Sequence, residues 1–506
     1  MASDSGDAAK PGRAYDVEEL APLPALHTLP GVSRVEQGAE AEFEAVYFDS
    51  EDLVLAARGI TLERRTGAQA GWQLEQPTND GERRVSSSPP VRGTDGVPKI
   101  LLQLVRVHVR DKPLVPVARV QTRRVLHRLR GSGDEVLADM LDDHLRSEQM
   151  ESPSGGSRWR EWSIELVEGN QDFLDACDAL CAGSGAQPGS RNSTLRSELS
   201  RHSRQSEPVV PCPKRKGEAA AVVLFFLHQH VRSLKEQDPL VRSGEPEAIH
   251  KMRVASRRLR SSLATYRKLL AGDTAGELRG ELKWLAGLLG EARDAQVMQD
   301  RLRDILAGEP AELVLGPVSR RIDEQLGADL KAAQAKTLRA LDTKRYFRLL
   351  DALDWLLSDS PLTELASELA REVIGRHVKR EAKRLRRAVT AAEQPPGGAT
   401  DARALHEVRI RAKRLRYAAE AAVPVGGKRA QRLAEAAQRV QQSLGVHQDT
   451  VLTRELLRRL GAGSVLQNEN GFSYGRLHAL EQFAAENAEA TFRREWEGFP
   501  STSIKP

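Results

Sequence analysis

The pattern of apolar and polar residues divides the chain into two parts with different periods. Between residues 41 and 166, short runs rich in β-branched and aromatic residues alternate with Gly, Asp and Pro, which is typical of strands separated by turns. We predict strands near 44–48, 60–66, 72–74, 115–120 and 161–167. The run 100–109 fits both the strand and the helix period, and 170–182 predicts a helix.

From residue 218 to about 495, apolar residues recur at spacings of three and four, and Ala, Leu, Glu and Arg dominate, which predicts helices. Between the two parts, the Ser-, Gly-, Pro- and Arg-rich stretch 183–217 has the composition of a linker. Helix breaks are expected at Pro239, 244–246, 308–310, 360–361, 395–398 and Pro424.

The length of 506 residues suggests two to four domains. We expect a disordered leader over 1–14, a β-rich domain over 15–205, a linker over 206–217, a helical domain over 218–495 and a tail over 496–506. The longest apolar run, 222–227, is too short to span a membrane, and residues 1–13 lack the apolar segment of a secretory signal. Three cysteines are too few to staple the fold, so the cytoplasm is the expected compartment. Cys177 and Cys181, one helical turn apart, are interpreted as core residues rather than a metal pair.

The helical half contains an internal repeat. The segment 250–260 (HKMRVASRRLR) aligns with 406–416 (HEVRIRAKRLR), 156 residues later, with identical His, Arg, Arg, Leu and Arg. A second pair of motifs, 289–294 (LGEARD) and 444–449 (LGVHQD), recurs 155 residues apart. Two motifs repeated at nearly one offset indicate duplication of a unit of roughly 140–150 residues.

Each copy of the first motif places cations on one side of a helix. At about 100° per residue, His250, Arg253, Arg257 and Arg260 lie within about 80° of one another. The opposite side carries Met252, Ala255, Leu259 and Leu263, which we predict to be buried. The second copy repeats this arrangement, with His406, Arg409, Lys413 and Arg416 opposite Val408, Ala412, Leu415 and Ala419.

A third helix carries a purely basic face spanning about 140°, formed by Arg376, Lys379, Arg380, Lys383, Arg384 and Arg387. All three faces could be solvated helix surfaces. Few acids lie inside them, however, and like charges one turn apart repel, so we predict that they bind a polyanion. Arginine favours bidentate phosphate recognition. The net charge of +5 alone does not imply such a partner.

The two histidines allow several interpretations. A histidine at a helix start is often a structural hydrogen-bonding group, and beside arginine it can also donate to phosphate. Metal binding is disfavoured because no cluster of ligands with close spacing accompanies either residue and the arginines would repel a cation. Aromatic residues make up 4% of the chain, and only Tyr266 and Tyr417 lie near the basic faces. Base stacking therefore has little to use, which argues against single-stranded nucleic acid.

On these motifs, residues 218–495 resemble the CHAD family, whose domain consists of two pseudo-symmetric four-helix bundles. The resemblance implies binding of inorganic polyphosphate along a basic surface or pore, and association with polyphosphate granules. It adds Arg258, Arg293 and Arg414 to the candidate contacts. Gln448 departs from the pattern, because it stands where the first copy has Arg293.

The N-terminal half resembles the CYTH, or triphosphate tunnel, family on 45–67, 71–77 and 159–169. The resemblance implies an α+β protein, in which an antiparallel β tunnel precedes the all-α domain, with basic residues for triphosphate and acidic residues for a divalent metal. The acidic first-strand motif of that family is matched only by 16–20 (DVEEL), with Leu20 in place of a lysine. Glu63 and Glu75 stand where cations are usual, and Ser163 interrupts the acidic row of Glu161 and Glu165. Residual phosphate contacts would be Arg58, Arg65 and Arg124.

We therefore expect a polyphosphate-binding protein without catalytic or metal-binding residues, located in the cytoplasm and on polyphosphate granules, with no specific nucleic acid and no membrane as partner. The alternative is a triphosphatase that uses Mg²⁺ or Mn²⁺ in the N-terminal tunnel, since metal-assisted hydrolysis needs an acidic set to hold the ion. A third possibility is a histidine that accepts a phosphoryl group.

Overall fold

A computed structural model describes residues 12–67, 70–77, 83–90, 96–149, 156–189, 195–197, 199, 210–393 and 402–500. The chain divides into two compact units, Met1–Glu207 and Pro208–Pro506. Residues 1–11 of the expected leader, 206–209 of the expected linker, 501–506 of the tail and the helix break at 395–398 lie outside the described residues.

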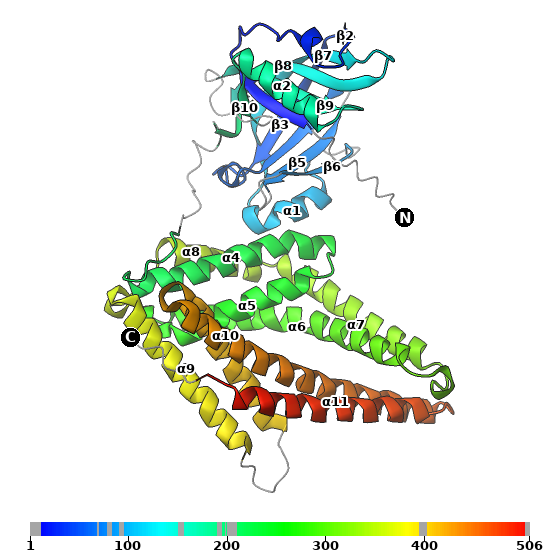
Figure 1. The fold of residues 1–506 in the computed structure, drawn as a ribbon, viewed down its shortest axis with the longest axis vertical. Helices are drawn as coiled ribbons and strands as arrows, with labels where there is room; N and C mark the ends of the chain where they lie inside the picture. Colours follow the sequence, from blue (N-terminus) through cyan, green and yellow to red (C-terminus); the bar gives the residue numbers. More distant parts are fainter. Residues whose placement is uncertain are drawn as a thin grey trace. The chain divides into compact units, whose positions relative to one another are not determined.

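The first unit is a curled antiparallel sheet, a half-barrel (Figure 1). Its strands follow the order β10-β1-β9-β8-β7-β3-β4-β5-β6, and β2 pairs with β7. The five predicted strands are confirmed as β3, β4, β5, β7 and β9. The strands are β1 (Gly12–Val17), β2 (Arg34–Gln37), β3 (Ala41–Asp49), β4 (Thr61–Arg65), β5 (Gly71–Pro77), β6 (Arg83–Ser88), β7 (Val115–Arg130), β8 (Val136–Gln149), β9 (Arg158–Leu166) and β10 (Gln187–Gly189).

Two helices cover the outer face of this half-barrel. The ambiguous run 100–109 forms helix α1 (Lys99–Val109), whose Leu101 and Val105 pack on Leu62 and Trp72. The predicted helix 170–182 is confirmed as α2 (Gln171–Gly183), which begins where the Asn170 side chain accepts a hydrogen bond from the backbone of Phe173. Cys177 and Cys181 lie in the core beneath α2 and are fully buried, as predicted.

Part of the stretch 183–217, which we interpreted as a linker from its composition, packs against the inner face of the half-barrel. Leu195 is fully buried and Leu199 is 6% exposed, and both pack with Ala45, Tyr47 and Trp159. The interpretation of 183–217 as a linker is therefore wrong in its first part. Two leucines in a Ser-rich stretch give no periodicity that composition could detect.

The second unit is all-helical among its described residues, and the predicted fold class is confirmed. Its helices are α4 (Ala219–Ser243), α5 (Ala248–Thr265), α6 (Thr274–Ala307), α7 (Val318–Leu341), α8 (Lys344–Ser358), α9 (Ala370–Glu393), α10 (Ala402–Leu466) and α11 (Phe472–Glu497). Helix α10 contains a kink at Gly427, whose φ of 57° and ψ of −146° divide it into two helical segments. Two predicted breaks are wrong in position, because Pro239 lies inside α4 and Pro424 inside α10 ahead of the kink.

The internal repeat appears as two sets of four helical segments. The first set is α4–α7, and the second is α9, the two segments of α10 and α11. Helix α5 corresponds to the first segment of α10, at the offset of 156 residues given by the repeated motif. Helix α4 corresponds to α9 with a step of 151, since the buried positions Val223, Phe226 and Leu234 match Ile374, His377 and Leu385. The two halves are therefore pseudo-symmetric four-helix units, as predicted.

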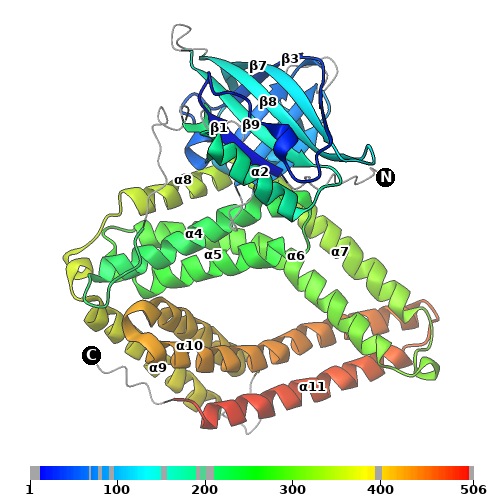
Figure 2. The ribbon, with the colours of Figure 1, turned by 45° about the horizontal axis from the view of Figure 1, so that its top comes forward.

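The long helices of the two halves meet at their far ends (Figure 2). Leu302 of α6, Ile322 of α7, Leu457 of α10 and Leu477 of α11 share one buried apolar cluster there. Within the described residues, no helix is both long and apolar enough to cross a membrane.

Candidate anion-binding site

The two predicted His-led helix faces point toward one another. Their apolar sides are buried as expected, since Met252, Leu259, Val408 and Leu415 are all 0% exposed. Their polar sides lie close together, since the charges of Arg257 and Arg253 on α5 lower the pKa values of Arg409 and Lys413 on α10. All four are half-buried, and we call them the cationic cluster.

The cluster is electrostatically unfavourable in the ligand-free protein. Burial, followed by the charges of Arg257, Arg409 and Arg253, lowers the pKa of Lys413 to about 6. Burial also lowers the pKa values of Arg257 and Arg409. In addition, the buried Nε atoms of Arg253 and Arg409 have no hydrogen-bond partner. An anion bound beside these cations would reduce the electrostatic cost of their partial burial most directly.

Two carboxylates neutralise part of this charge, and sequence reasoning did not assign them a role. Arg253 Nη1 donates to Asp294 Oδ1 at 2.9 Å. Asp449 is near Arg409 and Lys413, and burial is the main cause of its raised pKa. Both aspartates end the repeated Leu-Gly motif, so the recurrence of that motif was the signal that could have found them.

The glycines of the same motif make room for the arginines. A Cβ atom on Gly290 would lie 3.6 Å from Arg253 Nη2, and one on Gly445 would lie 3.4 Å from Arg409 Nη2. A methyl group would just touch the guanidinium, and any longer side chain would displace it. The two repeated motifs are thus parts of one site, in which each Leu-Gly helix supports the arginine of the His-led helix.

The two histidines differ in their surroundings. His250 is half-buried, and its pKa is lowered by burial and then by the charge of Arg293. His406 is exposed, and its Nδ1 lies 2.7 Å from Gln448 Oε1. Gln448 therefore stands at the position of Arg293 as a partner of the histidine rather than as a further cation. Within the described residues, no group of three or more His, Cys, Asp and Glu side chains could hold a metal ion.

Several of the predicted contacts flank the cluster and already have partners. Glu420 pairs with Arg258 at 3.2 Å and with Arg416 at 2.7 Å. Both guanidinium groups lie over the ring of Tyr417, at 5.6 and 5.8 Å from its centroid. Arg258 and Arg416 are therefore less available to a ligand than the four cluster residues.

Arg260 and Arg414 connect the cluster with the third basic face. The pKa of Arg260 is lowered by burial, then by Arg257, with a further contribution from Arg414. The pKa of Arg414 is lowered by burial, then by Arg411, and Arg384 of α9 contributes as well. A series of neighbouring cations thus leads from the cluster to α9.

The third basic face is exposed on α9. We call it the α9 face, formed by Arg376, Lys379, Arg380, Lys383, Arg384 and Arg387. Arg376 pairs with Glu368 at 2.6 Å, and Arg384 pairs with Glu381 at 2.5 Å. The opposite side of the helix is buried and largely apolar, although it includes His377 and Glu381. The basic residues therefore form a solvent-facing cationic surface.

In the half-barrel, the three predicted residual phosphate contacts are all engaged within the protein. Arg124 Nε and Nη2 each donate to the Asp143 carboxylate at 2.7 Å. Arg65 pairs with Glu63 at 2.5 Å, and Arg58 Nη1 donates to the Val54 carbonyl oxygen at 2.9 Å. Glu63 and Asp143 therefore neutralise Arg65 and Arg124, whereas Arg58 is held by a backbone carbonyl group.

The first strand also differs from the expected alignment. Strand β1 ends at Val17, and Leu20 lies in the turn beyond it, 95% exposed. The residues of β1 opposite Glu161 and Ser163 are Asp16 and Ala14. Cross-strand pairs share a face of the sheet. Asp16 therefore shares a face with Glu161, whereas Glu18 and Leu20 of the stretch 16–20 lie beyond the end of β1.

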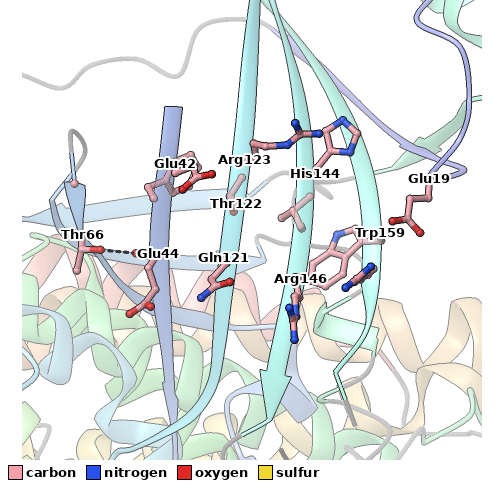
Figure 3. Close-up of a pocket in the computed structure, with 14 residues that line it drawn as sticks. Glu19, Glu42, Glu44, Thr66, Gln121, Thr122, Arg123, His144, Arg146 and Trp159 are labelled. Atoms are coloured by element: carbon pink, nitrogen blue, oxygen red, sulfur yellow. Dashed lines mark hydrogen bonds between the residues drawn. The ribbon is translucent and has the colours of Figure 1, made fainter. Parts of the chain in front are cut away.

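A cavity of about 590 Å³ lies against strands β3, β7, β8 and β9 of the half-barrel (Figure 3). Glu42, Glu44, Arg123, His144 and Arg146 line it together with Glu19, so charges of both signs surround the same space. Strand pairing places Glu42, Arg123 and His144 on one face, opposite to the face of Arg124 and Asp143. The lining also includes Phe43, Thr122 and Leu145 from the face of Arg124 and Asp143, so residues of both faces of the sheet border the cavity.

The family model of the CHAD domain matches residues 226–458. Two uncharacterized proteins of Mycobacterium tuberculosis, MT2285 and Rv2226, are each 35% identical over 501 residues, which is 95% of this chain and 95% of theirs.

Two solved structures are also similar. PptA from Streptomyces chartreusis is 23% identical with a TM-score of 0.47, and the match covers 55% of this chain and 99% of that one. The CHAD domain from the plant Ricinus communis is 24% identical with a TM-score of 0.41, and the match covers 58% of this chain and 92% of that one. The family match, together with the duplicated motifs, shows that the helical half of this chain contains a CHAD domain.

Proposed function

We propose that the helical domain binds inorganic polyphosphate, with the cationic cluster as the centre of the site. The observation that carries this proposal is the imbalance of charge there, because four half-buried cations are opposed by the carboxylates of Asp294 and Asp449. Phosphate oxygens would neutralise the remaining charge.

A long chain of phosphates fits the arrangement better than a single phosphate. Cations continue from the cluster through Arg260 and Arg414 toward the α9 face. A repeating anion can follow such a path and gain one contact after another, whereas a short anion fills the cluster alone. Binding that depends on phosphate charge without base recognition also suits the position of Tyr417, whose ring is already covered by arginines.

The binding experiment is a fluorescence anisotropy titration of the full-length protein with labelled medium-chain polyphosphate, in competition with single-stranded DNA of equal charge. We expect polyphosphate to be preferred by at least tenfold. Arg257→Ala combined with Lys413→Ala removes one cation from each half and should abolish that preference. The matched control removes two exposed cations from α7, Arg320→Ala with Lys331→Ala, and should leave the affinity within about twofold. Equal losses in both variants would contradict the proposal.

We further propose that the protein does not hydrolyse polyphosphate. We also propose that it is located on polyphosphate granules in the cytoplasm. The supporting observation is that Arg65 and Arg124 in the half-barrel are paired with Glu63 and Asp143. Incubation with tripolyphosphate and Mg²⁺ or Mn²⁺ should release no phosphate above a protein-free control. Metal-dependent turnover that is lost in Glu161→Ala would instead establish a working triphosphatase site. Co-localisation of the tagged protein with stained granules tests the location.

A further inference from the structure

Lys413 is the lysine of the cationic cluster, and the internal repeat shows that it stands where the other half has an arginine. By the offset of 156 residues, Lys413 of α10 corresponds to Arg257 of α5. An arginine keeps its proton in proteins, whereas a buried lysine can lose it. The second half of the repeat therefore places an ionisable amine at the position of a permanent cation.

The amino group of Lys413 is not engaged within the protein. Its side chain is half-buried, and among the described residues its Nζ has neither a hydrogen-bond nor an ion-pair partner. By contrast, Lys235 and Lys112, which are also shielded from solvent, each pair with an aspartate. The Lys413 nitrogen is not fully enclosed either, so small solutes can reach it.

The charges around this amine are mostly positive. Arg409 precedes Lys413 by one turn of α10, and Arg253 and Arg257 act on it from α5. Asp449, on the second segment of α10, opposes them. Burial and the three arginines lower the pKa of Lys413 to about 6, so the amine is largely neutral at pH 7. A neutral lysine beside other cations is an activated nucleophile.

The same arginines suit a phosphate leaving group. Arg257 and Arg409 are half-buried cations on either side of the amine, and guanidinium groups pair well with phosphate oxygens. An acyl phosphate carries its phosphoryl group directly on the carbonyl carbon that an amine attacks. With its phosphoryl group at the arginines, such a compound would present this carbon to Lys413 Nζ. The cluster thus combines a nucleophile with the means to hold and stabilise the departing phosphate.

We propose that Lys413 is a site of covalent acylation by small acyl phosphates, and that this modification regulates the cationic cluster. The amine nitrogen attacks the carbonyl carbon, so a C–N bond forms and the C–O bond to the phosphoryl group breaks. Inorganic phosphate leaves with the bonding electrons, and the nitrogen releases a proton to solvent. The product is a neutral amide, which no longer contributes a cation to the cluster. Recognition of the phosphoryl group rests on the anion binding proposed above.

The test is mass-spectrometric mapping of the full-length protein after incubation with acetyl phosphate at neutral pH. The exposed Lys331 of α7 serves as the internal reference. We expect Lys413 to be acetylated at least about tenfold faster than Lys331. p-Nitrophenyl acetate, which carries the acyl group without a phosphate, should show a smaller preference for Lys413. Bound long-chain polyphosphate should protect Lys413, because it covers the cluster and restores the proton of the amine.

Two variants separate the nucleophile from its surroundings. Arg257→Ala removes a phosphate contact and a charge that keeps the amine neutral, so acetylation of Lys413 should slow by about tenfold while that of Lys331 is unchanged. Acetyl phosphate should lower the polyphosphate affinity of the wild-type protein by about tenfold. It should leave the affinity of Lys413→Arg unchanged, because that variant lacks the amine.

The outcomes distinguish this modification from polyphosphate binding itself. Equal acetylation rates of Lys413 and Lys331, in a protein that binds polyphosphate, would overturn the acylation site and leave the proposed function intact. An equal preference for Lys413 with both reagents would overturn the recognition of the phosphoryl group. Rapid acetylation of Lys413 without any loss of polyphosphate affinity would overturn the regulatory role, and the cluster would no longer be the centre of the polyphosphate site.

Discussion

The half-barrel and the helical domain both contain arginines that sequence analysis associated with phosphate, but they treat the charge differently. In the half-barrel, Arg124 makes two hydrogen bonds to Asp143, and Arg65 is paired with Glu63. In the helical domain, the cationic cluster retains excess charge, and burial with neighbouring cations lowers the pKa of Lys413 to about 6. Arginine content alone therefore does not identify an anion site. What distinguishes the two regions is whether the positive charge has already been neutralised.

The largest expected effect comes from removing one side of the cluster. Arg253→Ala with Arg257→Ala, or Arg409→Ala with Lys413→Ala, removes two charge-assisted contacts of about 1.5–3 kcal/mol each. Affinity for long-chain polyphosphate should fall about a hundredfold or more in each variant. Tripolyphosphate, which cannot span both helices, should lose less.

A salt titration measures the same effect independently. The slope of log affinity against log salt concentration reports the number of neutralised phosphates. Each double variant should flatten this slope relative to the wild-type protein. A slope that is unchanged in either variant would mean that its helix face is only solvated, and the comparison between the two regions would fail there.

The second prediction concerns the pH dependence of polyphosphate affinity. This affinity should change by at most about tenfold per pH unit. Because the pKa of Lys413 is lowered in the ligand-free protein, phosphate binding should restore its charge and take up a proton. Affinity should therefore fall as pH rises from 7 to 9, a range in which the lowered pKa of His250 keeps that group neutral. Lys413→Arg stays charged, as Arg257 does in the other half, and should remove most of the pH dependence. Identical pH profiles for both proteins would contradict the assignment.

The stability of the ligand-free protein should change in the opposite direction. The pKa of Lys413 is lower in the folded state than in the unfolded state, so the unfolded chain binds more protons between about pH 6 and 10. The contribution of this group to stability is then lost as pH falls toward 6 and grows as pH rises. If stability rises with pH while polyphosphate affinity falls, both trends can be attributed to Lys413 rather than to a group that affects only one of them.

The helical half could be predicted well because its information is local and repeated. Leu259 and Leu415 lie on apolar sides whose period appears in the sequence, and both are fully buried. The repeat also implied that the two helices are equivalent. It could not show that they face one another, because that depends on packing between halves more than 150 residues apart.

The details that sequence reasoning missed have long-range or context-dependent causes. Asp294 becomes part of the site only through its contact with Arg253 on another helix. Helix α10 continues through Pro424 and kinks at Gly427, where a positive φ favours glycine. In the half-barrel, Leu195 is buried by residues of distant strands, although its neighbours in sequence are polar.

The third prediction tests the role of the aspartates that neutralise part of the cluster. Removing one of them should raise polyphosphate affinity a few-fold. Asp294→Asn removes the carboxylate that neutralises Arg253, a pair in which the side chains are 23% and 48% exposed. Partly exposed pairs contribute at most about 1 kcal/mol, so polyphosphate affinity should rise about two- to fivefold. Asp323→Asn breaks a similar pair with Arg303 outside the cluster and should leave affinity unchanged. A loss of affinity in Asp294→Asn alone would show that the aspartate positions Arg253 rather than competing with the ligand.

The smallest expected effect on binding is that of Arg124→Met in the half-barrel. Arg124 is committed to Asp143, and both side chains are largely buried, at 15% and 9% exposed. Removing one member of a buried pair leaves the other charge uncompensated, which costs about 3–5 kcal/mol when burial is complete. The melting temperature should therefore fall, while the affinity for long-chain polyphosphate stays within about twofold of the wild-type value. Asp143→Asn provides the matched test, because it would free the guanidinium of Arg124. A large loss of affinity in Arg124→Met at a temperature where the variant is folded would show that the half-barrel takes part in binding, and internal pairing would no longer separate the two regions.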